Sequence, residues 1–274
     1  MTEITMKTML ECGAHFGHQT TRWNPKMTKY IYASRNGIHI LNLQKTLVEF
    51  RRAEEYVRKM AQEGKKLLFV GTKKQAQKLI ADEAGRCGMF FINERWLGGT
   101  LTNFPTMRKS IDRLLELERM EAEGEFERLH KKEAVKKRKE IVKLNKFFNG
   151  IKSMKGIPDA IFLVDIEKEH IALKEARKLG VKIIALVDSN CNPDGVDLPI
   201  PANDDAIRSL KLFISRIADL CLEGQELHRA RQAESKGREE KGDRKSEPRS
   251  SSKREAVKKA PAPAPVAEAE TETE

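Results

Sequence analysis

A glycine-led basic stretch has the residue types that bind phosphate. Gly71-Thr72-Lys73-Lys74 follows the apolar run 67–70 and opens a segment of helical spacing. Free N–H groups at a helix N-terminus attract anions, and two lysines add charge. The GxxxxGK[ST] and GxGxxG spacings of mononucleotide and dinucleotide sites are both missing. We therefore favour a nucleic-acid phosphate; the alternative is an ordinary helix start with Thr72 as N-cap and solvated lysines.

A second stretch, 95–103 (RWLGGTLTN), suits RNA. Its two glycines let the backbone approach a partner, and Arg, Trp, Thr and Asn supply charge, stacking and hydrogen bonds. Basic loops at 22–29 and 95–109 extend the surface; the alternative is that the tryptophan only caps the core. The predicted RNA contacts are Arg22, Lys26, Lys29, Lys73, Lys74, Arg95, Trp96, Thr100, Asn103, Arg108 and Lys109.

A third group could hold a cation. His15 and His18 flank Phe16-Gly17, and acidic residues lie at 188 and 204–205. Imidazole and carboxylate together suit zinc, so the candidate ligands are His18, Asp188 and Asp204. The alternative is that the histidines are hydrogen-bonded structural residues. No nucleophile–base pair stands out, so we predict no catalytic residues, no bound nucleotide and no cofactor.

The composition narrows the class of partner. The chain has 274 residues, a net charge of +11 and 34% charged residues, which indicates a polyanionic partner, nucleic acid before membrane. No apolar run is long enough to span a bilayer, and we expect no signal peptide and no membrane partner. Four scattered cysteines without a CxxC pair indicate a reducing, cytoplasmic location.

The elements that position these residues centre on a βαβ unit. Residues 160–164 and 182–187 are apolar runs of strand length, and 167–179 between them has helical spacing ended by Gly180. Lys174, Glu175, Arg177 and Lys178 are predicted to face outward. Such strands are parallel and buried on both faces, and ligands of such sheets lie at the strand C-terminal ends, here at Asp165 and Asp188.

Further strands and helices complete an α/β sheet. We expect strands at 67–70, 89–92 and 198–200, the last at an edge because of its prolines. Asn36-Gly37 predicts a hairpin of 30–33 and 38–41, preceded by a loop that includes residues 15–27. Helices are expected at 5–13, from a cap at Asn42 or Thr46 to about 63, after Gly71, and at 206–222.

Two segments lie outside this sheet. Residues 104–148 carry two apolar stripes broken at Gly124 and predict an antiparallel coiled-coil hairpin, with helices of about 30 Å, that projects. Residues 229–274 carry a net charge of +2, leaving +9 for the rest, and their composition predicts a disordered tail that the fold does not need. The predicted organisation is one α/β domain (1–104 and 149–228), the inserted hairpin (105–148) and the tail (229–274).

Several motifs together resemble a known family. HFGH with RWNPKM, RNGIHILNL, LFVGTKKQA, RWLGGTLTNF, PDAIFLVD and IIALVDSNCNPDGVDLPIPANDDAI are similar, in this order across residues 1–225, to the small-subunit ribosomal protein two family. The hairpin resembles the bacterial branch of that family. The tail is not part of the pattern.

The resemblance implies a non-enzymatic, flavodoxin/Rossmann-like α/β domain with a protruding coiled coil. It also implies a structural constituent of the cytoplasmic ribosome that binds small-subunit ribosomal RNA, supports translation and helps dock the largest small-subunit protein. The alternatives are a nucleotide- or phosphate-binding α/β enzyme and a DNA-binding architectural protein.

Overall fold

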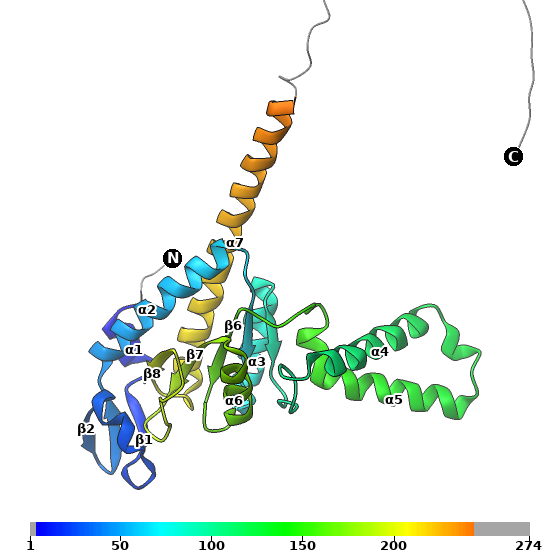
Figure 1. Ribbon diagram of the computed structural model, residues 1–274. Helices are drawn as coiled ribbons and strands as arrows, with labels where there is room; N and C mark the ends of the chain where they lie inside the picture. The colour runs from blue at the N-terminus through cyan, green and yellow to red at the C-terminus, as the bar shows by residue number, and fades with distance from the viewer. Residues whose placement is uncertain (1–3, 244–274) are drawn as a thin grey trace, which may run out of the picture. The chain divides into compact units, whose positions relative to one another are not determined.

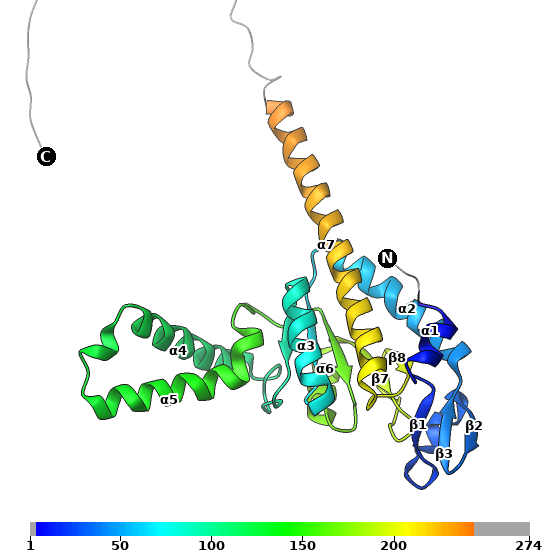
Figure 2. The same ribbon diagram turned by 180° about the vertical axis from the view of Figure 1, so that it is seen from behind.

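The computed structural model describes residues 4–243, and the chain divides after Gln232 into two compact units. The helices and strands are drawn in Figures 1 and 2. In chain order they are α1 (Met6–Glu11), β1 (Phe16–Gln19), β2 (Ile31–Arg35), β3 (Ile38–Leu41), α2 (Leu43–Gln62), β4 (Leu67–Val70), α3 (Lys74–Cys87), β5 (Phe90–Ile92), α4 (Phe104–Ala122), α5 (Lys131–Phe148), β6 (Ala160–Val164), α6 (His170–Leu179), β7 (Lys182–Val187), β8 (Leu198–Pro201) and α7 (Ile207–Asp243).

The centre of the fold is a five-stranded sheet in the order β5-β4-β6-β7-β8, with every neighbouring pair parallel. This confirms the predicted α/β class, and β8 lies at an edge as its prolines require. Numbered within the sheet, the order is 2-1-3-4-5, the doubly wound order of flavodoxin-like proteins. The order reverses between β4 and β6, where such sheets bind ligands.

Apolar side chains cover both faces of the sheet and form two cores. On one face, Phe69 of β4 and Phe162 of β6 pack edge to face in a cluster that includes buried residues of α2, α3 and α7. On the other face, Leu68 and Leu163 belong to a cluster that includes α6 and the base of the α4–α5 pair. Figures 1 and 2 show these two faces in turn. Strands buried on both faces explain why the sequence reads as continuous apolar runs.

A small antiparallel sheet, in the order β1-β3-β2, precedes the main one. The predicted hairpin is present, and Asn36 and Gly37 turn it with φ of 52° and 73°. Strand β1 was not predicted, because FGHQ at 16–19 has one apolar residue, a glycine and no alternation. Its strand conformation comes from pairing with β3, which its own residues do not reveal.

Helices α4 and α5 form a helical pair inserted between β5 and β6, and the figures show them side by side, leading away from the sheet. The predicted stripes lie inside the pair, with Ile111, Leu114, Leu117 and Ile141 all buried. Gly124, at a φ of 72°, ends the first helix region.

The structure confirms a predicted N-cap of α2 and shows that the predicted N-cap of α3 is wrong. Asn42 caps α2 through its side chain, which accepts hydrogen bonds from the amides of Gln44 (3.0 Å) and Lys45 (3.3 Å). Thr72 does not cap α3: the cap position is Lys73, without a side-chain bond. The Thr72 hydroxyl instead donates to Glu169, which lies far away in the sequence.

The last helix continues well beyond its predicted end. Residues 206–222 were expected to be helical, whereas α7 runs to Asp243. The added segment is rich in Glu, Lys, Arg, Ala and Gln, which have high helix propensity, so neither Gly224 nor the loss of apolar periodicity ends it. Residues 244–274, which hold most of the predicted tail, lie outside the described residues.

Candidate nucleic-acid interface

The ligand edge of the sheet carries a lysine surrounded by carboxylates. Strand β4 ends at Val70, and Lys73 follows it across the switch point from Asp165, which follows β6. The Lys73 ammonium lies 3.1 Å from Asp165, 2.7 Å from Asp204 and 2.8 Å from Asp205. The lysine side chain is only 14% exposed. Where a flavodoxin-like sheet would bind a ligand, this chain places its own cation.

The surroundings shift the pKa values of this cluster. Burial alone would lower the pKa of Lys73, but the carboxylates of Asp204, Asp205 and Asp165 outweigh it and hold that pKa above its usual value. Burial raises the pKa of Asp204 to about 7, and repulsion from Asp188 and Asp165 adds to this effect against the attraction of Lys73. Lys73 therefore stays charged, while Asp204 is poised to hold or release a proton near neutrality.

His18 adjoins the same cluster. Gly17 lets strand β1 approach the loop after β7, because a side chain there would come within 2.8 Å of the Ser189 hydroxyl, to which the His18 amide donates. Nδ1 of His18 lies 3.0 Å from Asp188, whose hydrogen bond raises the histidine pKa to about 9. The ligand atoms of His18, Asp188 and Asp204 lie within 4.8 Å of one another.

These three residues fit a divalent cation. Asp188 and Asp204 are fully buried, and Oδ2 of Asp204 has no hydrogen-bond partner among the described residues. One imidazole and two carboxylates are a donor set that zinc accepts. The sequence identified the three residue types, and the fold brings them together from β1, the end of β7 and the segment before α7.

The loop 95–103 is held by one buried carboxylate, Glu175 of α6. Its oxygens accept hydrogen bonds from Nε1 of Trp96 (3.1 Å) and the Thr102 hydroxyl (3.2 Å). They also accept from three backbone amides, those of Gly99 (2.7 Å), Leu101 (3.0 Å) and Thr102 (3.1 Å). Burial would raise the pKa of Glu175, but these bonds outweigh it and lower the pKa.

Glu175 was predicted to face outward, and the structure places it inside. A glutamate among lysines and arginines on a helix reads as a surface residue, and its partners lie more than 70 residues earlier. The two glycines were predicted to let the backbone approach a partner; of these, Gly99, at a φ of 89°, lets the loop turn around this carboxylate. No local pattern could have identified this contact.

Burial divides the predicted RNA contacts. Trp96 and Thr100 are buried, since the tryptophan donates to Glu175 and the threonine hydroxyl to the carbonyl of Leu97, so neither side chain is open to RNA. Lys73 is occupied by carboxylates, and Arg108 donates to the carbonyls of Lys152 and Met154 at the base of α4. The exposed members are Arg22, Lys26, Lys29, Lys74, Arg95, Asn103 and Lys109.

Comparison with known proteins decides the family. Residues 9–224, well over half of the chain, match the family model described as "Ribosomal protein S2". The chain belongs to the ribosomal protein S2 family. Two curated proteins named "Small ribosomal subunit protein uS2", from two strains of Treponema pallidum, are each 54% identical over 243 residues, covering 89% of this chain and 84% of theirs. The resemblance predicted from the motifs is thereby confirmed.

Within residues 4–243, no helix is both long enough and apolar enough to cross a bilayer.

Proposed function

We propose that this protein is a structural, non-enzymatic constituent of the small ribosomal subunit that binds small-subunit ribosomal RNA and supports translation in the cytoplasm. The match to the ribosomal protein S2 family over residues 9–224 carries this proposal. The name shared by the two Treponema relatives points the same way. The net charge of +11 suits a polyanionic partner.

The RNA contacts are proposed to be the exposed basic and polar residues on three segments. Arg22, Lys26 and Lys29 lie between β1 and β2, Lys74 begins α3, and Arg95, Asn103 and Lys109 lie at and after the loop 95–103. Glu175 supports this surface from beneath by fixing the backbone of the loop. Lys73 is left out, since a phosphate would have to compete with three carboxylates already within 3.1 Å.

Salt dependence of binding to purified small-subunit RNA tests this assignment. Each phosphate contact releases counterions, so Lys74→Gln and Lys109→Gln should each weaken binding and reduce the slope of log affinity against log salt by about 0.7–0.9. Lys59→Gln is the control, because Lys59 of α2 is paired with Glu55. Slopes equal to that of the control would contradict the assigned surface.

The α4–α5 pair is proposed to be a coiled-coil arm that helps dock the largest small-subunit protein. Three apolar side chains on the pair stay exposed, Leu115 (38%), Val135 (45%) and Val142 (71%), although its inner stripe is fully packed. The proposed division of the chain is an α/β domain at 1–104 and 149–228, an arm at 105–148 and a tail from 229. A pull-down with the partner protein, comparing Val142→Lys with Lys143→Gln, should lose the partner only in the first variant.

A divalent cation at His18, Asp188 and Asp204 is a second proposal. The buried, unpartnered Oδ2 of Asp204 favours it, because an ion would satisfy this atom. Metal analysis of the purified protein should find about one equivalent of zinc. His18→Ala should lose it, while His170→Ala, a histidine outside the cluster, should retain it. Equal metal content in both variants would contradict the assignment.

A further inference from the structure

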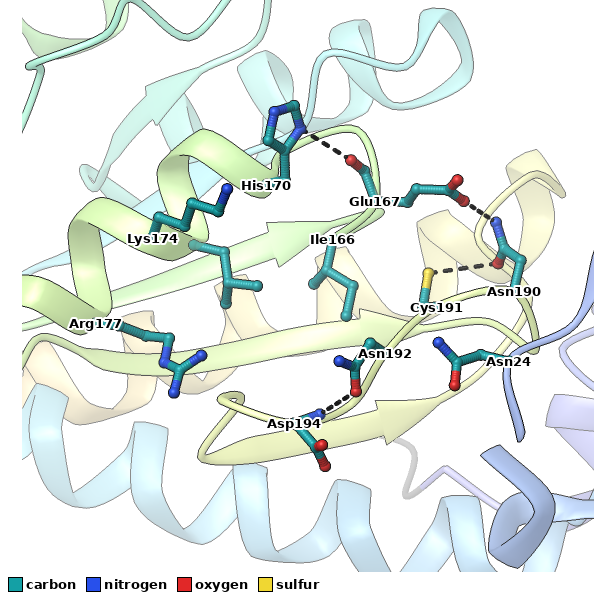
Figure 3. A pocket seen from close by; sticks show the side chains of 11 residues that line it. Asn24, Ile166, Glu167, His170, Lys174, Arg177, Asn190, Cys191, Asn192 and Asp194 are labelled. Atoms are coloured by element: carbon teal, nitrogen blue, oxygen red, sulfur yellow. Dashed lines mark hydrogen bonds between the residues drawn. The ribbon is translucent and has the colours of Figure 1, made fainter. Parts of the chain in front are cut away.

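A pocket of about 420 Å³ opens between α6 and the loop that follows β7 (Figure 3). Ile166 and Leu173 supply apolar lining. His170, Lys174 and Arg177 follow one another along the α6 wall, and Asn24 and Asn192 face them from the other side. The volume lies within the range of small-molecule sites. Neither the RNA surface nor the cation cluster proposed above uses these α6 residues.

The charges around the pocket include three cations and two carboxylates. The lining lysine and arginine face Glu167 and Asp194, and the Lys26 ammonium, which pairs with Asp194, adds the third cation; the side-chain amide of Asn190 donates to Glu167 and leaves its charge in place. Lys174 and Arg177 have no carboxylate within 4.0 Å among the residues whose side chains the structure describes. Two free cations one helical turn apart on the same wall are suited to an anion.

The guanidinium of Arg177 lies close to Gly195, in the loop after β7. A Cβ atom on Gly195 would lie 2.4 Å from a guanidinium nitrogen of Arg177, and the glycine has a φ of 89° that other residues rarely adopt. The guanidinium therefore rests against bare backbone, and its planar group is available for stacking.

The two asparagines present fixed hydrogen-bond donors. Oδ1 of Asn24 accepts from the amide of Lys26, and Oδ1 of Asn192 accepts from the amide of Asp194, both at 3.0 Å. These bonds orient the carboxamides, and their Nδ2 groups have no partner among the described residues. Amide donors of this kind hydrogen-bond the acceptor edges of nucleobases.

We propose that this pocket takes one unpaired nucleotide of the RNA, with its base against Ile166 and Leu173 and its phosphate held by Lys174 and Arg177. The proposal rests on the RNA-binding function above and deepens it. Unpaired bases that leave the helix are the parts of RNA that pockets recognise, by stacking and amide hydrogen bonds. Two cations match the single charge of a phosphodiester better than the several charges of a free nucleoside triphosphate.

Charge variants of the full chain test the phosphate contact. Lys174→Gln and Arg177→Gln should each weaken binding to purified small-subunit RNA severalfold and reduce the salt slope by up to about 0.9. Lys178→Gln is the matched control, since Lys178 is exposed on the same helix but does not line the pocket. Equal affinity and slope in all three variants would overturn the phosphate contact, provided that wild type binds with the usual salt dependence.

A variant whose larger side chain fills the pocket tests whether the base enters it. Leu173→Trp keeps every charge but occupies the space, so affinity should fall about tenfold through lost base contacts. Leu179→Trp, on the exposed side of α6, should bind like wild type. Ultraviolet crosslinking should join a nucleotide to residues 166–177 or 190–194 in wild type and Leu179→Trp, and not in Leu173→Trp.

Asn192→Ala provides a second test that adds no volume and removes no core packing, because Asn192 is exposed. It should lose affinity severalfold without a change in salt slope, since it removes a donor and no charge. Wild-type affinity in both Asn192→Ala and Leu173→Trp would overturn the pocket while leaving the RNA-binding function standing. A wild-type chain that fails to bind the RNA would overturn both.

Discussion

Two buried glutamates near α6 have pKa shifts of opposite sign. Glu169 accepts hydrogen bonds from the amide and hydroxyl of Thr72, at 2.9 and 2.6 Å, yet its burial outweighs them and raises its pKa. Glu175 is also desolvated, but hydrogen bonds from three backbone amides and two side chains lower its pKa. Glu175 accepts more hydrogen bonds, whereas Glu169 is more deeply buried and is repelled by Asp165, so the same residue type plays two different electrostatic roles.

Glu175→Gln should destabilise the protein at neutral pH. An amide cannot accept from all five donors, so we expect a loss of about 3 kcal/mol in the free energy of unfolding, measured by urea denaturation. In wild type, the folded pKa is below the unfolded value of 4.5, so this contribution is present above about pH 4.5 and is lost as the pH falls through the folded pKa. A variant as stable as wild type at pH 7 would show that the loop does not depend on this carboxylate.

Glu169→Gln should behave in the opposite way. The folded pKa is raised, so the contribution of Glu169 is fully present below about pH 4.5 and is lost as the pH rises through the folded value. Glutamine keeps an acceptor for Thr72 and has no charge to desolvate, so the variant should be at least as stable as wild type at pH 8. Urea unfolding at pH 5 and pH 8 checks this, and a variant that loses stability only at pH 8 would contradict it.

The sequence could predict side chains whose role is local and could not predict those paired across the fold. It offered Asn42 as one of two possible caps of α2, and it named His18, Asp188 and Asp204 as candidate ligands from residue type, although only the fold brings these three together. It placed Glu175 on the surface, because the buried partners of that residue come from another part of the chain. Burial of this kind depends on tertiary packing, so the periodicity of a single helix cannot predict it.

At the scale of elements, every strand of the main sheet was predictable within one residue. The inner strands β4, β6 and β7 are apolar runs apart from Lys182 at the start of β7, because a strand buried on both faces must be apolar throughout. Strand β1 was not predictable, because it depends on pairing with β3. The length of α7 was not predictable either, because its last part is helical through helix propensity alone. The α4–α5 pair was predictable from its stripes, because its partner helix is nearby in the sequence.

Deletion of residues 106–147, with a short linker in their place, should leave the α/β domain folded. The residues that join the pair to the core, Phe104, Phe148 and Ile151, remain in this variant. Circular dichroism should show a cooperative melt, while co-sedimentation with small subunits should weaken. Loss of the cooperative melt would mean that the arm is part of the domain core.

Truncations of α7 should distinguish its packed part from the rest. Gln225 donates to the carbonyl of Cys87, and Nδ1 of His228 lies 2.9 Å from the carbonyl of Gln62. A chain ending at Gly224 loses both bonds, so the sequence-based expectation of an unchanged melting temperature gives way to a fall of roughly 4–8 °C. A chain ending at Gln232 should melt like the full protein, and equal temperatures for both truncations would contradict the assigned contacts.

At the scale of the whole molecule, the strand order forces partners far apart in the sequence to meet. Leu67 of β4 pairs with Ala160 of β6, and 67 residues separate Ile92 of β5 from Ala160. A crossover between parallel strands needs only a dozen or more residues, so the length of this connection comes from the inserted α4–α5 pair. The sequence indicated the parallel strands, but their order came only from the structure.

The position of the α4–α5 insertion has a consequence for how the chain folds. A flexible segment of 67 residues must be closed before β6 can join β4, and the entropic cost grows with the logarithm of the segment's length. A helical pair that forms early brings Phe104 close to Phe148, and only 22 connecting residues are then left to close. The shorter segment lowers the entropic cost of closure by about 1 kcal/mol. By holding the two ends of this segment together, the arm would speed the pairing of β6 with β4 as the chain emerges during synthesis.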